Sequence, residues 1–226
     1  MSVSVEIDPR RQVKGTSGLV SGTKFWDRIA RKYAAQPVKN VAAYRATLDR
    51  VRSYLRPGDR MLEVGCGTGS TALTLAGEVE SYVASDVSPG MIGIAREKLA
   101  ADGAPNLEFT VAPVVETRFD AGSFDVVFGS SIYHLVDDLG ASLRRAHELL
   151  KPGGLFISKT PCLGEMSRLI RLAIPVMRFF GKAPDTVLNF TKAELEASIR
   201  KAGFEIVEAR AFEGAPNSWF VVARKI

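Results

Sequence analysis

The chain has 226 residues, 46% of them hydrophobic and 24% charged, which is enough for one α/β domain with a sizeable core. The formal net charge of +5 is spread among nearby acids and forms no basic run, so nucleic acid is not favoured as a partner. No apolar run has the length of a membrane span or the form of a signal peptide. Two cysteines and two histidines are too few for a disulfide framework or a metal site, and we expect a reduced, cytoplasmic setting.

The first part of the chain is predicted to form an arm and a cap. Residues 1–23 mix serine, glycine, threonine and charge without helical periodicity, and we expect a flexible arm there. Apolar residues at helical spacing then predict two helices, at 24–35 and 38–55. We expect these cap helices, within residues 24–56, to lie over the mouth of a ligand site.

From residue 60 onward, short apolar runs alternate with helical patterns. The runs predict strands at 60–64, 81–85, 107–111, 124–129 and 155–160, with helices at 70–76, 89–101 and 137–150 between them. This alternation is typical of a doubly wound α/β fold with a parallel sheet. We expect residues 24–226 to form a single domain.

The pattern changes after Cys162. Residues 163–181 are apolar with basic residues at intervals, and Pro175 interrupts them, so we expect a helical lid insertion at 162–190 that contains two short helices. Residues 191–194 then form a capping box that opens a helix to Lys201. Two late strands are predicted at 204–211 and 218–223.

Residues 61–70, MLEVGCGTGS, end an apolar strand in a carboxylate and three glycines spaced two apart. Glycines let a backbone turn tightly and approach a ligand closely. The helix that follows presents backbone N–H groups at the carboxyl edge of the sheet, where open α/β folds bind ligands. The loop that we expect to contact the ligand comprises Gly65, Cys66, Gly67, Thr68 and Gly69.

The glycine spacing differs from the dinucleotide fingerprint, because its sixth position is Ser70. Glu63, directed at the same loop, suits a cationic ligand, such as one with an α-amino group, better than a diphosphate. About twenty residues further on, Asp86 ends the next apolar run, where a carboxylate can accept hydrogen bonds from ribose hydroxyls. These features argue against NAD.

With these motifs the sequence resembles the class I S-adenosylmethionine-dependent methyltransferases, in the small-molecule branch with the ubiquinone and menaquinone methyltransferases. Four further segments carry the resemblance in the family's order: 25–33, 85–91, 122–127 and 150–154. The resemblance implies a Rossmann-like, seven-stranded sheet, mostly parallel with the last strand antiparallel. It also implies S-adenosyl-L-methionine as the cofactor and S-adenosyl-L-homocysteine as the product.

The resemblance assigns roles to particular residues. Tyr33 in the cap would reach the methionine end of the cofactor, Glu63 and the glycine loop would hold the methionine part, and Asp86 would hold the ribose. Further contacts with the cofactor are implied for Val87, Met91, Pro113, Val114 and Ser130. Many relatives carry an aspartate for the adenine amino group where this chain has Pro113, so adenine would be held by apolar packing and backbone groups, or by Glu116.

Methyl transfer from a sulfonium is an in-line displacement with an activated donor, so a catalytic base is optional. His134 is the candidate base, because it follows the fourth predicted strand at the carboxyl edge; a structural histidine is the alternative. Tyr133 beside it is a candidate for binding the acceptor or lining the methyl channel. His147 is predicted to pack or to lie at the surface.

Two patterns bear on the acceptor. Cys162 follows a proline, but residues 130–133 lack both the proline–cysteine pair of RNA cytosine methyltransferases and the clamp of base N-methyltransferases, so Cys162 is predicted to be a small buried side chain. We expect a small-molecule, apolar or amphipathic acceptor. A quinone precursor or other lipid, and a non-catalytic cofactor-binding or regulatory protein, remain the alternatives. Residues 163–181 either pack as a lid or form a peripheral membrane contact with arginines toward anionic lipid.

Overall fold

The computed structural model describes residues 22–115, 119–167, 173, 175, 177–180 and 183–226. Almost all of the expected arm, Glu116 and much of the 163–181 segment therefore lie outside the described residues. Within the described part of the chain, none of the helices combines the length and the apolar character that a membrane span requires.

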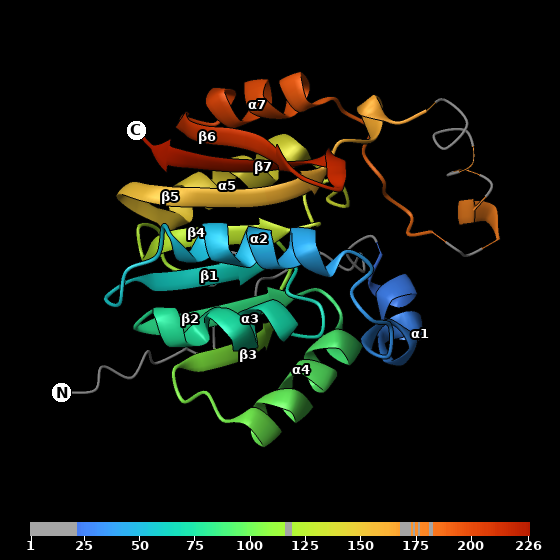
Figure 1. Cartoon of the computed structure of the whole chain (residues 1–226), viewed down its shortest axis with the longest axis horizontal. Helices are drawn as coiled ribbons and strands as arrows, with labels where there is room; N and C mark the ends of the chain where they lie inside the picture. The colour runs from blue at the N-terminus through green and yellow to red at the C-terminus, as the bar shows by residue number, and fades with distance from the viewer. Residues whose placement is uncertain (1–21, 116–118, 168–172, 174, 176, 181–182) are drawn as a thin grey trace, which may run out of the picture.

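Seven strands form one mixed sheet in the order β3-β2-β1-β4-β5-β7-β6 (Figure 1). They are β1 (Arg60–Val64), β2 (Ser81–Asp86), β3 (Leu107–Val111), β4 (Phe124–Ser130), β5 (Leu150–Pro161), β6 (Phe204–Phe212) and β7 (Ala215–Lys225). The pairs among β1 to β5 are parallel, and β7 is antiparallel to both of its neighbours. The predicted sheet is thus confirmed, and the strand order reverses between β1 and β4, where such folds bind ligands.

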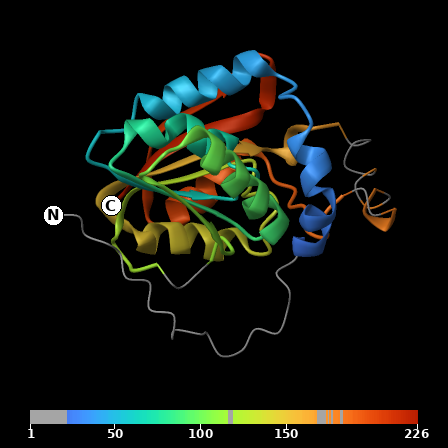
Figure 2. The same cartoon turned by 90° about the horizontal axis from the view of Figure 1, so that it is seen from below.

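Helices cover both faces of this sheet (Figures 1 and 2). One face packs against α2 (Val41–Arg52), α3 (Ser70–Leu75) and α4 (Pro89–Asp102), and the other against α5 (Leu139–Leu149) and α7 (Lys192–Lys201). Helix α1 (Thr23–Ala34) lies beyond the carboxyl ends of the strands, and short turns of 3₁₀ helix occur at η1 (Ala76–Glu78) and η2 (Leu163–Glu165). Each face buries its own hydrophobic cluster, and the two clusters are separated by the sheet.

At the junction between α5 and β5 the structure differs from the prediction. Helix α5 ends at Leu149, and β5 begins at once with Leu150, which pairs with Phe124. The next pair joins Val126 to Leu155, so residues 151–154 bulge out of the ladder. The glycines that predicted a turn before the strand therefore form a bulge inside a longer strand.

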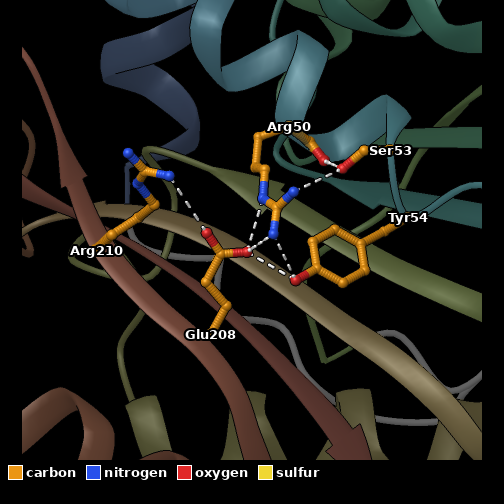
Figure 3. Close-up of polar contacts among 5 residues, drawn as sticks. All are labelled: Arg50, Ser53, Tyr54, Glu208 and Arg210. Atoms are coloured by element: carbon orange, nitrogen blue, oxygen red, sulfur yellow. Dashed lines mark hydrogen bonds and ion pairs between the residues drawn. The ribbon is translucent and has the colours of Figure 1, made fainter.

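A polar cluster centred on Glu208 fixes α2 to β6 (Figure 3). Its Oε2 atom accepts hydrogen bonds from Arg50 Nε and from the Tyr54 hydroxyl, both at 2.7 Å. The guanidinium of Arg210 lies 3.8 Å from the other carboxylate oxygen. Burial raises the pKa of Glu208, but the bonds from Arg50 and Tyr54 outweigh it, so the net pKa is lowered. The cluster therefore anchors α2 through charged hydrogen bonds. Since α2 packs on a face of the sheet and contributes no residue to the wall of the cavity described below, its expected position over the ligand site is not confirmed.

We expect Glu208→Ala to lower the free energy of unfolding by about 1 to 3 kcal/mol, because it leaves Arg50 and Tyr54 without their shared acceptor. Glu205→Ala is the control: this carboxylate is 62% exposed and lies 3.8 Å from Arg224, so its loss should cost less than about 0.5 kcal/mol. Urea unfolding at neutral pH measures both variants. Equal effects would show that the cluster does not anchor α2.

Candidate functional site

The glycine loop follows β1 at the carboxyl edge of the sheet. Its three glycines have left-handed backbones, with φ of 69°, 55° and 76° at Gly65, Gly67 and Gly69. A Cβ atom on Gly65 would lie 2.6 Å from the side chain of Ile132, and one on Gly69 would lie 2.5 Å from the ring of Phe109. Both positions therefore require glycine for packing as well as for backbone conformation.

Gly67 differs from the other two glycines. The atom nearest to a Cβ built on Gly67 lies 3.9 Å away, in the ring of Tyr33, so this side of the loop is open. A cavity of about 270 Å³ lies beside the loop. Its wall contains most of the residues that were predicted to contact the cofactor: Tyr33, Gly65, Gly67, Asp86, Val87, Met91, Pro113, Val114 and Ser130.

Asp86 joins the glycine loop to the turn after β2. Its Oδ2 accepts the N–H of Gly67 and its Oδ1 accepts the N–H of Ser88, each at 2.9 Å. Burial raises the pKa of Asp86, and these backbone N–H groups act against that rise. Since each carboxylate oxygen has a further lone pair and Asp86 lines the cavity, its position supports the predicted contact with ribose hydroxyls.

The cap helix α1 is held against the start of α4. Asp27 Oδ1 accepts the N–H of Gly90 at 2.9 Å and the hydroxyl of Ser88. The carboxylate thus accepts an N–H in the first turn of α4 that has no partner within the helix. Its negative charge also interacts favourably with the positive end of the helix dipole. This contact positions Trp26 and Tyr33 of the same helix on the cavity wall.

Glu63 lies behind the glycine loop rather than on the cavity wall. Its side chain is buried, and its Oε2 accepts the hydroxyl of Tyr82 at 2.9 Å. Burial raises the pKa of Glu63 to about 7. The hydrogen bond from Tyr82 lowers this pKa, and repulsion from Asp86 raises it further. A direct contact between Glu63 and an α-amino group stays a prediction. From its position behind the loop, the Glu63 carboxylate favours a cationic ligand through its charge instead.

The remaining loop residues predicted to contact the cofactor also lie off the wall. Cys66 is buried, and burial raises the pKa of its thiol, so the thiol is neutral. Thr68 Oγ1 accepts a hydrogen bond from Lys98 Nζ at 3.0 Å, which holds the loop against α4. Gly69 faces the core as described above. Among the described residues, no group of three or more histidine, cysteine or acidic side chains is arranged to hold a metal ion.

The two catalytic candidates differ in their surroundings, and neither is part of the cavity wall. Tyr133 is fully buried, and its ring packs 5.2 Å from that of Phe156, so the structure places it in the core instead of the predicted channel. His134 is mostly buried, and burial lowers its pKa to about 4. It is therefore neutral at physiological pH, as a base must be, and its catalytic role stays a prediction.

Several wall residues were not individually predicted from the sequence, although Trp26, Ser131 and Ile132 lie in segments that the sequence analysis used. They are Trp26, Ala112, Val115, Ser131, Ile132, Leu135, Val136, Asp137, Asp138, Ala141 and Ser142. Most follow β4 or begin α5, and only the folded path of the chain brings them to the glycine loop. Cys162 is buried as predicted, and the ring of His147 packs against Phe204 at 5.2 Å.

Comparisons with known proteins agree with this geometry. Residues 61–154 match the family described as a methyltransferase domain. The chain is 32% identical over 240 residues to a ubiquinone biosynthesis O-methyltransferase of Azorhizobium caulinodans, covering 99% of this chain and 92% of that protein. It is 28% identical over 222 residues to a ubiquinone/menaquinone biosynthesis C-methyltransferase of Brucella anthropi, covering 87% and 84%.

A solved structure shares the fold. A SAM-dependent methyltransferase of Thermotoga maritima, described as a possible histamine N-methyltransferase, superposes with a TM-score of 0.69 at 22% identity, covering 90% of this chain and 99% of that one. Together with the full-length similarity above, the chain belongs to the class I S-adenosylmethionine-dependent methyltransferases. It is an enzyme whose cofactor is S-adenosylmethionine, and a non-catalytic role is not favoured.

We expect Gly67→Ala to fold and to bind S-adenosylmethionine at least about tenfold more weakly, because its methyl group would point into the open side of the loop. Gly69→Ala is the matched variant: its methyl group would meet the Phe109 ring, so it should lose about 1 to 3 kcal/mol of stability. The left-handed backbone adds about 1 kcal/mol to both.

Calorimetric titration and thermal unfolding of both variants separate the two effects. Wild-type affinity in Gly67→Ala would show that the open side of the loop does not face the cofactor.

Proposed function

We propose that this enzyme transfers a methyl group to a hydroxyl oxygen of a small apolar acceptor. The observation that carries the proposal is the apolar character of the cavity wall beyond the glycine loop, where Trp26, Val115, Ile132, Leu135 and Val136 gather. The full-length similarity to an O-methyltransferase supports oxygen as the methylated atom. The similarity to a C-methyltransferase makes carbon the second candidate.

The residues of the cavity fit the cofactor. Asp86 would accept the ribose hydroxyls, and the open side of Gly67 would admit the methionine part beneath the ring of Tyr33. Val87 and Pro113 would pack against adenine, in place of an acid at the latter position. When bound, S-adenosylmethionine supplies a methyl group that its sulfonium already activates. The protein's own contribution is then alignment and the exclusion of water.

The segment after β4 is the part of the wall best placed to align the acceptor. Ser131 has φ of 58°, a left-handed conformation that non-glycine residues rarely adopt. Its N–H donates to the carbonyl oxygen of Lys159 at 2.7 Å, which holds the strained turn in place. We propose that this rigid turn orients the acceptor against the methyl group.

Only the described part of residues 162–190 bears on the predicted lid and membrane contact. Met177, Phe179 and Phe180 are exposed there, by 43%, 86% and 66%. We propose that these side chains close over an apolar acceptor or meet a lipid surface that supplies it. If Phe179→Ser abolishes turnover of an acceptor held in vesicles but leaves turnover of a soluble acceptor unchanged, the lipid surface is favoured.

The proposed reaction predicts which molecules accept the label from S-adenosylmethionine carrying a ¹³C methyl group. We expect alkyl-substituted phenols and catechols to become methyl ethers, and alkylbenzenes without a hydroxyl group to remain unlabelled. The ¹³C NMR shift separates a methyl ether from a methyl group on carbon. Label on carbon would favour the C-methyltransferase alternative, and no label on any hydroxyl acceptor would overturn the proposal.

We also propose that His134 accepts the hydroxyl proton, because its chain neighbours Ile132 and Leu135 approach the cavity and its imidazole is neutral. His134→Gln should then lower kcat by about 10² or more and leave the cofactor affinity unchanged. Because burial lowers its pKa to about 4 from the ordinary 6.5, the wild-type rate should show no inflection near 6.5 and should fall only as the pH drops toward 4. Native kcat in the variant would assign His134 to packing.

A further inference from the structure

Lys159 lies near the carboxyl end of β5 and is not itself a residue of the cavity wall. It pairs in register with Ser130 of β4, which lines the cavity, and its carbonyl holds the strained Ser131. Side chains two residues apart on a strand point to the same face of the sheet. Ile157 and Phe128 belong to the hydrophobic cluster beneath α2, so Lys159 and Ser130 point to that same face, side by side.

The ammonium group of Lys159 has no negative partner among the described residues. Its Nζ donates to the Thr47 hydroxyl at 3.0 Å, and this neutral hydroxyl itself donates to the carbonyl of Ala43. The centre of the Phe212 ring lies 5.8 Å from Nζ. An ammonium carries three N–H donors, so these contacts leave two of them for a ligand. Burial lowers the pKa of Lys159, since nothing nearby compensates its charge.

Two other lysines of the sheet, one on β5 and one on β7, are compensated. Lys151, at the opposite end of β5, lies 2.8 Å from both carboxylate oxygens of Asp125. Lys225 donates to the carbonyl oxygens of His147 and Leu150 at 2.7 and 2.8 Å. A half-buried cation without such partners costs free energy, which a bound anion would offset. The uncompensated charge therefore belongs to the strand that adjoins the Ser130 end of the cavity wall, and β1 and β4 separate this strand from the strand of Asp86.

We propose that Lys159 forms an anion subsite which binds the oxygen of the acceptor that is to be methylated, in its negatively charged form. This inference rests on the proposed transfer to oxygen. The acceptor hydroxyl passes its proton to His134, the base proposed above, and the resulting oxyanion, held by the ammonium, attacks the methyl carbon. The carbon–sulfur bond breaks and its electron pair stays on sulfur. The products are a methyl ether, S-adenosylhomocysteine and the released proton, while Lys159 keeps its charge throughout.

Binding of a carboxylate tests this subsite without any methyl transfer. We would titrate para-butylbenzoate and its neutral amide into the enzyme saturated with S-adenosylhomocysteine. The wild type should prefer the benzoate, and Lys159→Met should bind it at least about tenfold more weakly while its affinity for the amide is unchanged. Lys151→Met, on the same strand, is the matched control and should behave as the wild type. Equal affinity of wild type and Lys159→Met for the benzoate, or no preference over the amide, would overturn the subsite.

The fold of the variant is checked separately. Because Lys159→Met replaces a half-buried cation by an apolar side chain of similar length, its melting temperature should be equal to or above that of the wild type. Weaker binding with an unchanged melting temperature then reports on the charge alone.

Rates with phenols of graded acidity test the catalytic part. The loss of kcat/KM in Lys159→Met should be largest, about 10²-fold, for the least acidic phenols, whose oxyanions carry the most localised charge, and should fall to about tenfold for phenols that are already ionised in solution. An equal loss for all phenols would contradict stabilisation of an oxyanion. If the wild type forms no methyl ether and yet the benzoate pattern holds, the proposed function fails and the anion subsite stands.

Discussion

The site depends on how closely the chain packs around the glycine loop after β1. Because β1 lies near the middle of the sheet, its loop is packed from both sides. Ile132 after β4 fills the space beside Gly65, and Phe109 of β3 fills the space beside Gly69. Only Gly67 retains an open side, and its N–H is held by Asp86. The tight packing on two sides thus leaves one direction in which a ligand can approach the backbone.

Charge is distributed around this opening in a way that suits the two reactants. Glu63 behind the loop is a buried carboxylate and Asp86 on the wall a half-buried one, and their repulsion contributes to the raised pKa of Glu63. A cofactor that carries a sulfonium and an ammonium group would relieve that repulsion. On the other side of Ser130, Lys159 lacks a negative partner among the described residues. The negative side therefore matches the methyl donor, and the positive side matches an ionised acceptor.

The features that sequence reasoning located are those that depend on local chain chemistry. The glycine loop, Asp86 at the end of β2 and the capping box of α7 each follow from residues close together in the chain. The direction of Glu63 does not, because it is set by the hydroxyl of Tyr82 on the neighbouring strand. Tyr133 lies beside the wall in the chain but turns into the core, where Phe156 of β5 receives its ring. Contacts with neighbouring strands set the directions of both side chains, and a single sequence does not reveal such contacts.

The turn after β2 links the cofactor site to the cap. Asp86 holds this turn from the side of the loop, through the N–H of Ser88, and Asp27 of α1 holds it from the other side, through the Ser88 hydroxyl. The hydroxyl of Ser88 also accepts the N–H of Met91 and so caps α4. One short turn therefore serves the carboxylate assigned to the ribose, the start of α4 and the docking of α1. Since α1 carries Trp26 and Tyr33 to the cavity wall, the position of α1 is fixed by the same turn that Asp86 holds.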